Sequence, residues 1–250
     1  MRFKDQVVMV TGAAKGIGAA TARAFGREGA RVAVLDIDAP GAQAVADETK
    51  RLGGEALALK TDVTVAAEVR QAVDTIVSRW SRVDVLVNNA GGFSVMRKTE
   101  DIPDEEWDAV LRFNVTSAFL CTKAVLPLMK RQKSGRIVNL ASIVGRGGAV
   151  AVTAHYAAAK AAIIGFTRQL AREVGPDGIT VNAVAPGTVA TERFLALRGP
   201  EERKQMAASV PLRRVAEPDE IADAVLFLAS DAARYINGVA LDVNGGLVMA

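Results

Sequence analysis

Short runs of aliphatic and β-branched residues recur along the chain and alternate with longer stretches of helical spacing. The apolar runs lie at 6–10, 31–36, 55–60, 83–88, 136–141, 178–185 and 238–243. The stretches between them, rich in alanine or in apolar residues three or four positions apart, lie at 16–28, 40–52, 65–80, 104–132, 155–174 and 217–229. Strands that are this continuously apolar are buried on both faces, and strands that alternate with helices form right-handed βαβ units. The pattern predicts an α/β fold with a parallel sheet between two layers of helices.

The chain offers no obvious place at which to divide it. No Pro/Gly/Ser linker, low-complexity tract or step in composition interrupts its 250 residues, so we expect a single domain that spans 1–250. The alternation of strands and helices stops near residue 185 and gives way to a helical segment at 191–208. We expect 188–215 to form a substrate lid over the edge of the sheet.

Charge and composition argue against several classes of protein. The net charge is only +3, and no basic stripe is interleaved with aromatic residues, which argues against a nucleic-acid partner. One cysteine, Cys121, and one histidine rule out an intrachain disulfide and supply no usual zinc site. The N-terminus lacks the apolar stretch of a signal peptide, and no apolar run approaches a membrane span. We therefore expect a cytoplasmic protein with neither a metal site nor a membrane partner.

A glycine-rich turn, VTGAAKGIG, follows the first apolar run. Gly12, Gly16 and Gly18 allow a tight turn and the close approach of a phosphate. The helix that begins there offers free N–H groups and a positive dipole end. The spacing differs from the GxGxxG of the general dinucleotide fingerprint, so a glycine-rich turn without a ligand is the alternative.

The second apolar run ends at Asp36, where an acidic side chain can accept hydrogen bonds from the hydroxyls of an adenosine ribose. The same carboxylate repels a 2′-phosphate and so favours NAD over NADP. Lys15, in the glycine-rich turn, could attract that phosphate instead, but a flexible lysine can swing away. The alternative for Asp36 is a solvated residue at the end of a strand.

The third and fourth apolar runs end in TDV (61–63) and NNAGG (88–92). An open α/β sheet binds its ligand at the carboxyl ends of its strands. Both segments therefore belong to the same candidate site as the glycine-rich turn. A plain polar turn remains the alternative for NNAGG.

HYAAAK carries one of the two tyrosines of the chain. Tyr156 and Lys160 are four positions apart and share one face of a helix. A free tyrosine ionises near pH 10, and a nearby ammonium should lower that pKa enough for general acid–base work. Ser142 follows the fifth run and can hydrogen-bond a substrate oxygen. His155 points about 100° away around the helix; a place on the helix surface or pocket rim and participation in the site are both open, and we leave it out of the catalytic set.

Several short motifs occur in one order along the chain: TGxxxGxG at 11–18, Asp36, Asp62, NNAG at 88–91, Asn114, Ser142, YxxxK at 156–160, PG at 186–187 and VNGG at 243–246. This set resembles the short-chain dehydrogenase/reductase superfamily over essentially the whole chain. The resemblance implies one Rossmann-type domain with a seven-stranded parallel sheet, assembled as a homotetramer. It also implies hydride transfer between a nicotinamide and a carbinol or carbonyl carbon.

The resemblance assigns roles to individual residues. Tyr156 would be the general acid/base, Lys160 its activator, Ser142 the group that orients the substrate, and Asn114 the anchor of a water relay. Asn114 is also a poor helix-interior residue, so its side chain is expected to brace a local kink. Val189 would place its backbone at the nicotinamide carboxamide. The cofactor contacts implied in this way are Gly12, Lys15, Gly16, Ile17, Gly18, Asp36, Asp62, Val63, Asn89, Ala90, Gly91, Tyr156, Lys160, Pro186, Gly187, Val189 and Thr191.

The sequence says less about the substrate. Apolar candidates for the pocket are Phe93, Val95 and Met96, the segment 144–152, and Phe194 and Leu195 in the lid. They suit a ketone or secondary alcohol with a hydrophobic body. Packing of the lid onto the domain would explain them equally well.

Within the superfamily, the segments 104–119 and 170–187 resemble the 3-oxoacyl-carrier-protein reductases. Those enzymes usually take NADPH, whereas Asp36 favours NAD. They also dock an acidic carrier through basic residues; Lys133 fits one such position, but Asp177 stands where a second basic residue is expected. We therefore predict an NAD-linked oxidoreductase of a small secondary alcohol or ketone. The alternatives are an NADPH-dependent 3-oxoacyl-carrier-protein reductase and a non-catalytic dinucleotide-binding sensor.

Overall fold

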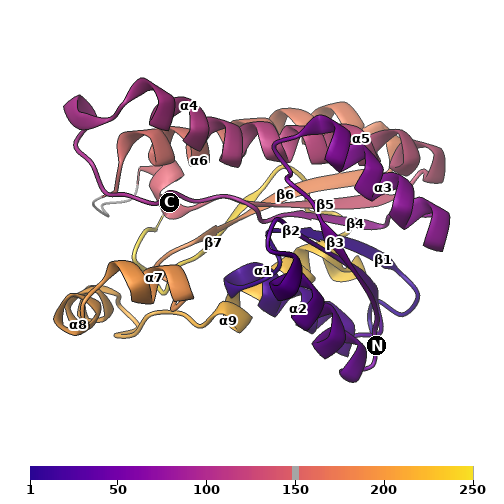
Figure 1. The fold of residues 1–250 in the computed structure, drawn as a ribbon, viewed down its shortest axis with the longest axis horizontal. Coiled ribbons are helices and arrows are strands. Elements are labelled where there is room, and N and C mark those ends of the chain that lie inside the picture. Colours follow the sequence, from indigo (N-terminus) through magenta and orange to yellow (C-terminus); the bar gives the residue numbers. More distant parts are fainter. Residues whose placement is uncertain (148–151, 250) are drawn as a thin grey trace.

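The apolar runs form a sheet of seven parallel strands within residues 1–147 and 152–249, the ranges that the computed structural model describes. The strands lie in the order β3-β2-β1-β4-β5-β6-β7. Their bounds are β1 Val7–Thr11, β2 Arg31–Asp36, β3 Glu55–Lys60, β4 Val85–Asn88, β5 Gly135–Leu140, β6 Ile179–Pro186 and β7 Ala240–Val243. The predicted α/β fold with a parallel sheet between helical layers is confirmed (Figure 1).

Each face of the sheet has its own core, because successive residues of a strand point to opposite faces. In β1, Val8 and Val10 pack into one cluster, while Val7 and Met9 pack into the other. All four side chains are fully buried, as expected for a central strand covered on both sides. This double burial is why the run reads as continuously apolar.

Helices cover both faces of the sheet (Figure 1). On one face lie α1 (Gly16–Arg27), α2 (Ala39–Arg51) and α9 (Pro218–Ala229). On the other lie α3 (Ala66–Trp80), α4 (Asp104–Leu111), α5 (Ser117–Gln132) and α6 (Ala154–Val174). Short 3₁₀ turns lie at Thr99–Asp101, Ile143–Arg146, Gly175–Asp177 and Asp231–Ala233.

A π-helical turn, Arg112–Thr116, separates α4 from α5 and has Asn114 at its centre. Asn114 donates to the carbonyl of Val110 at 2.8 Å and to that of Gly92 at 2.9 Å. Its own carbonyl accepts from the Gly92 amide at 2.8 Å. Asn114 thus braces a local departure from α-helical geometry, and turns of this kind occur often at functional sites.

The helical run Asp104–Gln132 is long and apolar enough to cross a membrane by length and composition. The expectation that no segment approaches a membrane span is therefore wrong for this run. Its apolar character has another structural reason, since Cys121, Val125 and Met129 are buried against the sheet.

The strand order reverses between β1 and β4. From β1 the chain continues outward through β2 and β3 on one side, and then returns to place β4 on the other. Open α/β sheets bind ligands at such a switch point, beyond the carboxyl ends of the strands.

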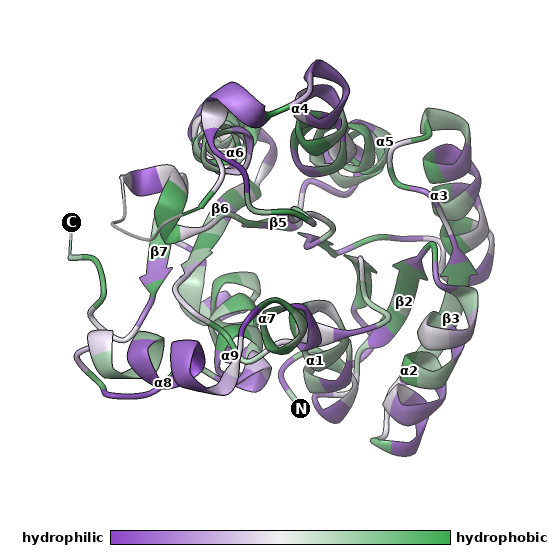
Figure 2. Cartoon of the chain, turned by 60° about the vertical axis from the view of Figure 1, so that its left-hand side comes forward, coloured by the Kyte–Doolittle hydropathy of each residue, from purple (hydrophilic) through white to green (hydrophobic). Residues whose placement is uncertain are grey.

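The segment after β6 lies near this switch point, on the same side of the sheet as α9 (Figure 1). It contains α7 (Glu192–Leu197) and α8 (Pro200–Ser209). The Thr191 hydroxyl caps α7 by accepting from the Phe194 amide at 3.3 Å, and Val189 forms an isolated bridge with Ala216. The ten residues of α8, all of them described, include no buried one, and α8 is largely purple in Figure 2. The predicted helical segment at 191–208 is confirmed as helix.

Candidate active site

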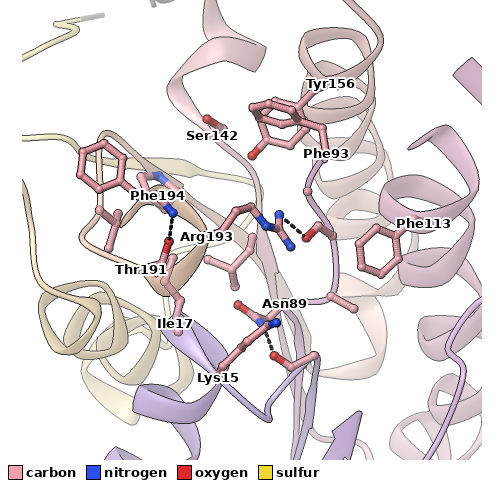
Figure 3. Close-up of a pocket in the computed structure, with 18 of the residues that line it drawn as sticks. Lys15, Ile17, Asn89, Phe93, Phe113, Ser142, Tyr156, Thr191, Arg193 and Phe194 are labelled. Atoms are coloured by element: carbon pink, nitrogen blue, oxygen red, sulfur yellow. Dashed lines mark hydrogen bonds between the residues drawn. The ribbon is translucent and has the colours of Figure 1, made fainter. Parts of the chain in front are cut away.

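A cavity of about 670 Å³ opens at the carboxyl ends of the central strands. The glycine-rich turn forms one wall, the ends of β2 to β6 form the floor, and α7 crosses the opposite side. Figure 3 shows side chains from these elements pointing into one space. Segments that are far apart in the sequence therefore meet at the predicted edge of the sheet.

The glycine-rich turn has a backbone shape that favours glycine at two positions. Gly12 has φ +61° and Gly16 has φ +56°, in the left-handed region that favours glycine. A Cβ on Gly18 would lie 2.3 Å from the Gly12 carbonyl oxygen. Gly18 thus serves close packing within the turn and does not line the cavity, whereas Gly12, Lys15, Gly16 and Ile17 do.

Asn89 fixes the glycine-rich turn from the neighbouring strand. Its side-chain amide donates to the carbonyls of Thr11 at 2.9 Å and Gly12 at 2.8 Å (Figure 3). The Thr11 hydroxyl in turn accepts from the amides of Asn89 and Ala90, each at 3.1 Å. The NNAG segment therefore braces the backbone that faces the cavity.

The carboxylate of Asp36 lies against the glycine-rich turn. One oxygen accepts from the Ala14 amide at 2.9 Å and the other from the Asp38 amide at 3.0 Å. Both Asp36 and Asp38 line the cavity. A negative charge is therefore held beside the turn, where a ribose would meet it.

Asp62 and Val63 line the cavity from the end of β3. Asp62 accepts from the amide and hydroxyl of Thr64 at 2.9 and 2.7 Å, and Glu68 caps the Asp62 amide at 2.7 Å. These bonds give the turn after β3 a fixed shape.

Tyr156 and Lys160 lie one turn apart on α6, and the Lys160 ammonium is 5.6 Å from the centroid of the Tyr156 ring. Lys160 also donates to the Leu140 carbonyl at 2.7 Å. Phe93 packs on the tyrosine at a ring distance of 4.8 Å. The hydroxyls of Ser142 and Tyr156 point into the same part of the cavity (Figure 3).

The electrostatics of this group differ from the simple expectation. Burial raises the pKa of the Tyr156 hydroxyl, and the Arg193 guanidinium and the Ser142 hydroxyl lower it by less. Burial, with a smaller contribution from Arg193, lowers the pKa of Lys160 to about 7. The expectation that Lys160 sets a low pKa for Tyr156 is wrong in this structure, because the same burial destabilises the ammonium itself. At neutral pH Tyr156 is a phenol that can donate a proton.

Asn114 stands behind the cavity and does not line it. It is 1% exposed, and its bonds to both backbone groups of Gly92 fix the segment after β4. A Cβ on Gly91 would lie 2.6 Å from the Asn114 carbonyl oxygen and 3.2 Å from the Lys160 ammonium. Asn114 is placed to hold the backbone beside Lys160.

The far end of the cavity is formed after β6 by Pro186, Gly187, Val189 and Thr191. A Cβ on Gly187 would lie 2.9 Å from Asn244, the asparagine of the VNGG motif. Thr191 lies across from the glycine-rich turn, since its methyl group would be 3.4 Å from a Cβ on Gly16. The two walls approach each other closely enough to enclose a flat, elongated ligand.

Only some of the residues that line the rest of the cavity were predictable from the sequence. Phe93, Val144, Val152 and Phe194 line the cavity as expected, but Val95, Met96 and Leu195 do not. The expected pocket residues 148–151 lie outside the described residues. Other residues also line the cavity that the sequence did not single out: Ile37, Thr64, Phe113, Leu140, Ala141, Ile143, Glu192, Arg193, Leu197, Arg198 and Met206. In the sequence, only its position two residues after Thr191 indicated that Arg193 could line the cavity.

His155 is buried, which excludes a place on the helix surface or pocket rim. It is 0% exposed, with Nδ1 2.8 Å from the Thr153 hydroxyl and Nε2 3.1 Å from a carboxylate oxygen of Glu106. Arg97 donates to the other oxygen of Glu106 at 2.7 Å. These bonds join the start of α6 to α4.

Comparisons with known proteins agree with this geometry. A family model described as enoyl-(acyl carrier protein) reductase matches residues 12–248. The chain is 45% identical over 248 residues to the 3-oxoacyl-[acyl-carrier-protein] reductase of Synechocystis sp., covering 98% of this chain and 97% of that protein. It is 42% identical to the 3-oxoacyl-[acyl-carrier-protein] reductase FabG of Escherichia coli K12 over the full length of both.

Two solved structures have the same fold. Levodione reductase has a TM-score of 0.93 and 35% identity, with 98% of each chain covered. A 3-oxoacyl-[acyl-carrier protein] reductase from Brucella melitensis with bound NAD has a TM-score of 0.92 and 37% identity, covering 100% of this chain and 93% of that one.

Proposed function

The chain belongs to the short-chain dehydrogenase/reductase family, and we propose that it reduces the 3-oxo group of an acyl thioester with NADH. It is an oxidoreductase that acts on a carbonyl or secondary alcohol. The sequence favours an NAD-linked enzyme of small hydroxy compounds, with a 3-oxoacyl reductase as the alternative. The relatives support the second more strongly as the substrate class.

The main support for this proposal is the arrangement of the cavity. Ser142, Tyr156 and Lys160 lie at one end of it, and the glycine-rich turn and Asp36 lie at the other. The cavity also fits a dinucleotide. The turn comes close to the opposite wall at Gly16, where a Cβ would touch the methyl group of Thr191 at 3.4 Å, and Gly16 leaves that space free. The N-cap residue of α1, Lys15, makes no side-chain hydrogen bond to the first turn, and that turn contains no acidic residue, so its N–H groups can bind a diphosphate.

When bound, the reduced nicotinamide supplies the hydride for the carbonyl carbon. Ser142 orients the carbonyl oxygen by hydrogen bonding, and Tyr156 gives its phenolic proton to that oxygen as negative charge develops there. Lys160, one turn away on the same helix, returns a proton from solvent to the phenolate that remains. Proton transfer of this kind contributes about 10²–10⁴-fold to the rate. We propose catalytic roles for Ser142, Tyr156 and Lys160, and a positioning role for Asn114.

We propose NAD(H) as the cofactor because of Asp36. Its carboxylate is fixed by two backbone amides beside the glycine-rich turn. It can accept both ribose hydroxyls, but it repels the charge of a 2′-phosphate. Lys15 is exposed, and its long side chain can swing away from the phosphate.

The remaining features of the proposal concern the whole chain. We propose that 1–250 is one domain, with 188–215 as a lid over the substrate. Exposed Trp107 and Phe119 on the α4–α5 run support assembly as a homotetramer. The free, buried thiol of Cys121 suits the reducing cytoplasm. No group of three or more His, Cys, Asp or Glu within the described ranges could hold a metal ion.

A panel of carbonyl substrates with both cofactors tests the proposed function. We expect NADH oxidation with acetoacetyl and longer 3-oxoacyl thioesters, and a kcat/KM at least tenfold lower with NADPH. Activity with cyclic or aliphatic ketones alone would contradict the substrate class. A preference for NADPH would contradict the role of Asp36.

A further inference from the structure

Arg193 is the second residue of α7, and its side chain lies inside the cavity (Figure 3). Its guanidinium donates to the Gly91 carbonyl at 3.1 Å. A Cβ on Gly92 would lie 1.4 Å from the nearer nitrogen of that guanidinium, so the group lies directly over the backbone after β4. The glycine at 92 makes room for it.

The position of Arg193 is the nicotinamide end of the cavity. Gly91 is next to Lys160, because a Cβ on Gly91 would lie 3.2 Å from the ammonium. The Arg193 charge is also close enough to Tyr156 and Lys160 to lower the pKa of both. Hydride transfer requires the reactive ring beside Tyr156, and therefore beside this guanidinium.

No carboxylate of the described residues forms an ion pair with Arg193, and Gly91 supplies its only hydrogen bond among them. The other arginine that the lid contributes to the cavity differs in this respect. Arg198 is paired with Glu202 at 2.8 Å. Lys160 has a pKa of about 7 and is only partly charged at neutral pH, whereas a guanidinium always keeps its charge. Arg193 is therefore the permanent, uncompensated cation at this end of the cavity.

The two redox forms of the cofactor differ in charge only at the nicotinamide. The oxidised ring is a pyridinium cation and the reduced ring is neutral, while the diphosphate and both riboses are the same. We infer that Arg193 makes the site bind NADH in preference to NAD⁺ and so favours the complex from which reduction starts. This inference rests on the proposed use of NAD(H) and names the residue that distinguishes the two redox forms.

The alternative role for Arg193 is the binding of the cofactor diphosphate, since α7 begins opposite the glycine-rich turn. The two roles differ in one measurable respect. A diphosphate contact strengthens the binding of NAD⁺ and NADH equally, whereas charge repulsion at the ring changes their ratio. ADP-ribose, which has the diphosphate but no nicotinamide, isolates the first effect.

The test is isothermal titration of NAD⁺, NADH and ADP-ribose into the substrate-free protein, its Arg193→Met variant and its Arg198→Met variant. For Arg193→Met we expect the ratio of Kd for NAD⁺ to Kd for NADH to fall by roughly two- to tenfold, the size of a partly screened interaction between single charges. Added salt should lower the ratio in the unmodified protein. Arg198→Met removes a lid arginine of similar size whose charge is already paired, and should leave the ratio unchanged.

An unchanged ratio in Arg193→Met would overturn the inference. So would an equal weakening of all three ligands, which would make Arg193 a diphosphate contact. Neither result depends on the substrate. If NADH binds and supports reduction of 3-oxoacyl thioesters while the ratio stays the same, only the role of Arg193 fails. If neither NAD⁺ nor NADH binds, the proposed function fails with it.

Discussion

At the scale of single residues, Asp36 is the group that decides between the two cofactors. Its two oxygens are engaged by backbone amides, so its position does not depend on a ligand. Asp36→Asn keeps an acceptor and removes the charge. We expect the ratio of kcat/KM for NADPH to that for NADH to rise at least tenfold, because a buried or partly buried charge interaction of this kind costs about 1–2 kcal/mol.

Asp38 offers a control for this measurement. It lines the same cavity, but its carboxylate caps α2 by accepting from the Gly41 amide at 3.1 Å. Asparagine is an equally good cap, so Asp38→Asn should change the cofactor ratio much less. Equal effects of the two substitutions would argue against a specific role for Asp36.

Lys160 gives a prediction about stability and pH. Its pKa falls from 10.5 to about 7 on folding, so between these pH values the unfolded chain binds a proton that the folded chain does not. The folded protein therefore becomes less stable as the pH falls from 10.5 to about 7, because its buried lysine must then take up a proton. Methionine carries no charge, so Lys160→Met removes this loss of stability. We expect it to raise the free energy of unfolding by about 2–5 kcal/mol at about pH 6.

The check is urea denaturation of both proteins at about pH 6 and about pH 9.5. The gain from Lys160→Met should shrink at the higher pH, where the lysine in the folded protein is neutral. A gain that is the same at both pH values would mean that packing, and not the buried charge, accounts for it.

At the scale of helices and strands, the contact between α4 and α6 depends on His155. Its ring bridges Thr153 and Glu106 from a fully buried position. The hydrogen bonds of His155 and, to a lesser extent, Arg97 hold the pKa of Glu106 below its ordinary value. His155→Ala leaves a cavity and an unpaired buried hydroxyl, and should lower the free energy of unfolding by about 2–4 kcal/mol.

Arg97 is the matched control, because it binds the other oxygen of the same carboxylate from an exposed position. Exposed ion pairs contribute about 1 kcal/mol or less, so Arg97→Ala should have a small effect in the same urea denaturation. If both variants lose the same stability, Glu106 and not the buried histidine is the main link between the helices.

Much of this level of structure could be predicted from the sequence. The run at 31–36 coincides with β2, and the helical stretch at 155–174 differs from α6 by one residue. Such segments are predictable because the spacing of apolar residues along a short segment indicates which of its faces are buried. The kink at Asn114 was predictable for a similar local reason.

The predictions that were wrong or missing concern residues whose contacts are distant in the sequence. Nothing around His155 indicates that it meets Glu106 on another helix. Likewise, the direction of the Arg193 side chain follows from the path of the chain after β6 and from the space above Gly92. The raised pKa of Tyr156 reflects burial by several elements at once, whereas the sequence shows only its nearest lysine.

At the scale of the whole molecule, the surface charge near the end of α5 bears on how a substrate is delivered. Lys133 and Lys130 both face Asp177, at 2.9 and 3.6 Å. This carboxylate offsets a basic surface that an acidic carrier protein could use. Asp177→Lys should therefore raise kcat/KM for acetoacetyl groups on an acidic carrier by roughly threefold or more at low salt.

A small neutral thioester, acetoacetyl-N-acetylcysteamine, serves as the comparison. Its kcat/KM should not change with Asp177→Lys, because it makes no use of the surface. An equal change for both substrates would place the effect of the substitution in the active site and exclude a docking surface around Lys133.

The central claim is that Tyr156 donates the proton that completes reduction by NADH. The most direct measurement is the rate of NADH oxidation with acetoacetyl thioester by the unmodified protein and by Tyr156→Phe, with the Kd for NADH determined on both. The account predicts a loss of at least about 10²-fold in kcat, with the Kd for NADH changed by less than about threefold, since the phenyl ring still packs on Phe93. A Tyr156→Phe variant that keeps most of its kcat would contradict the account.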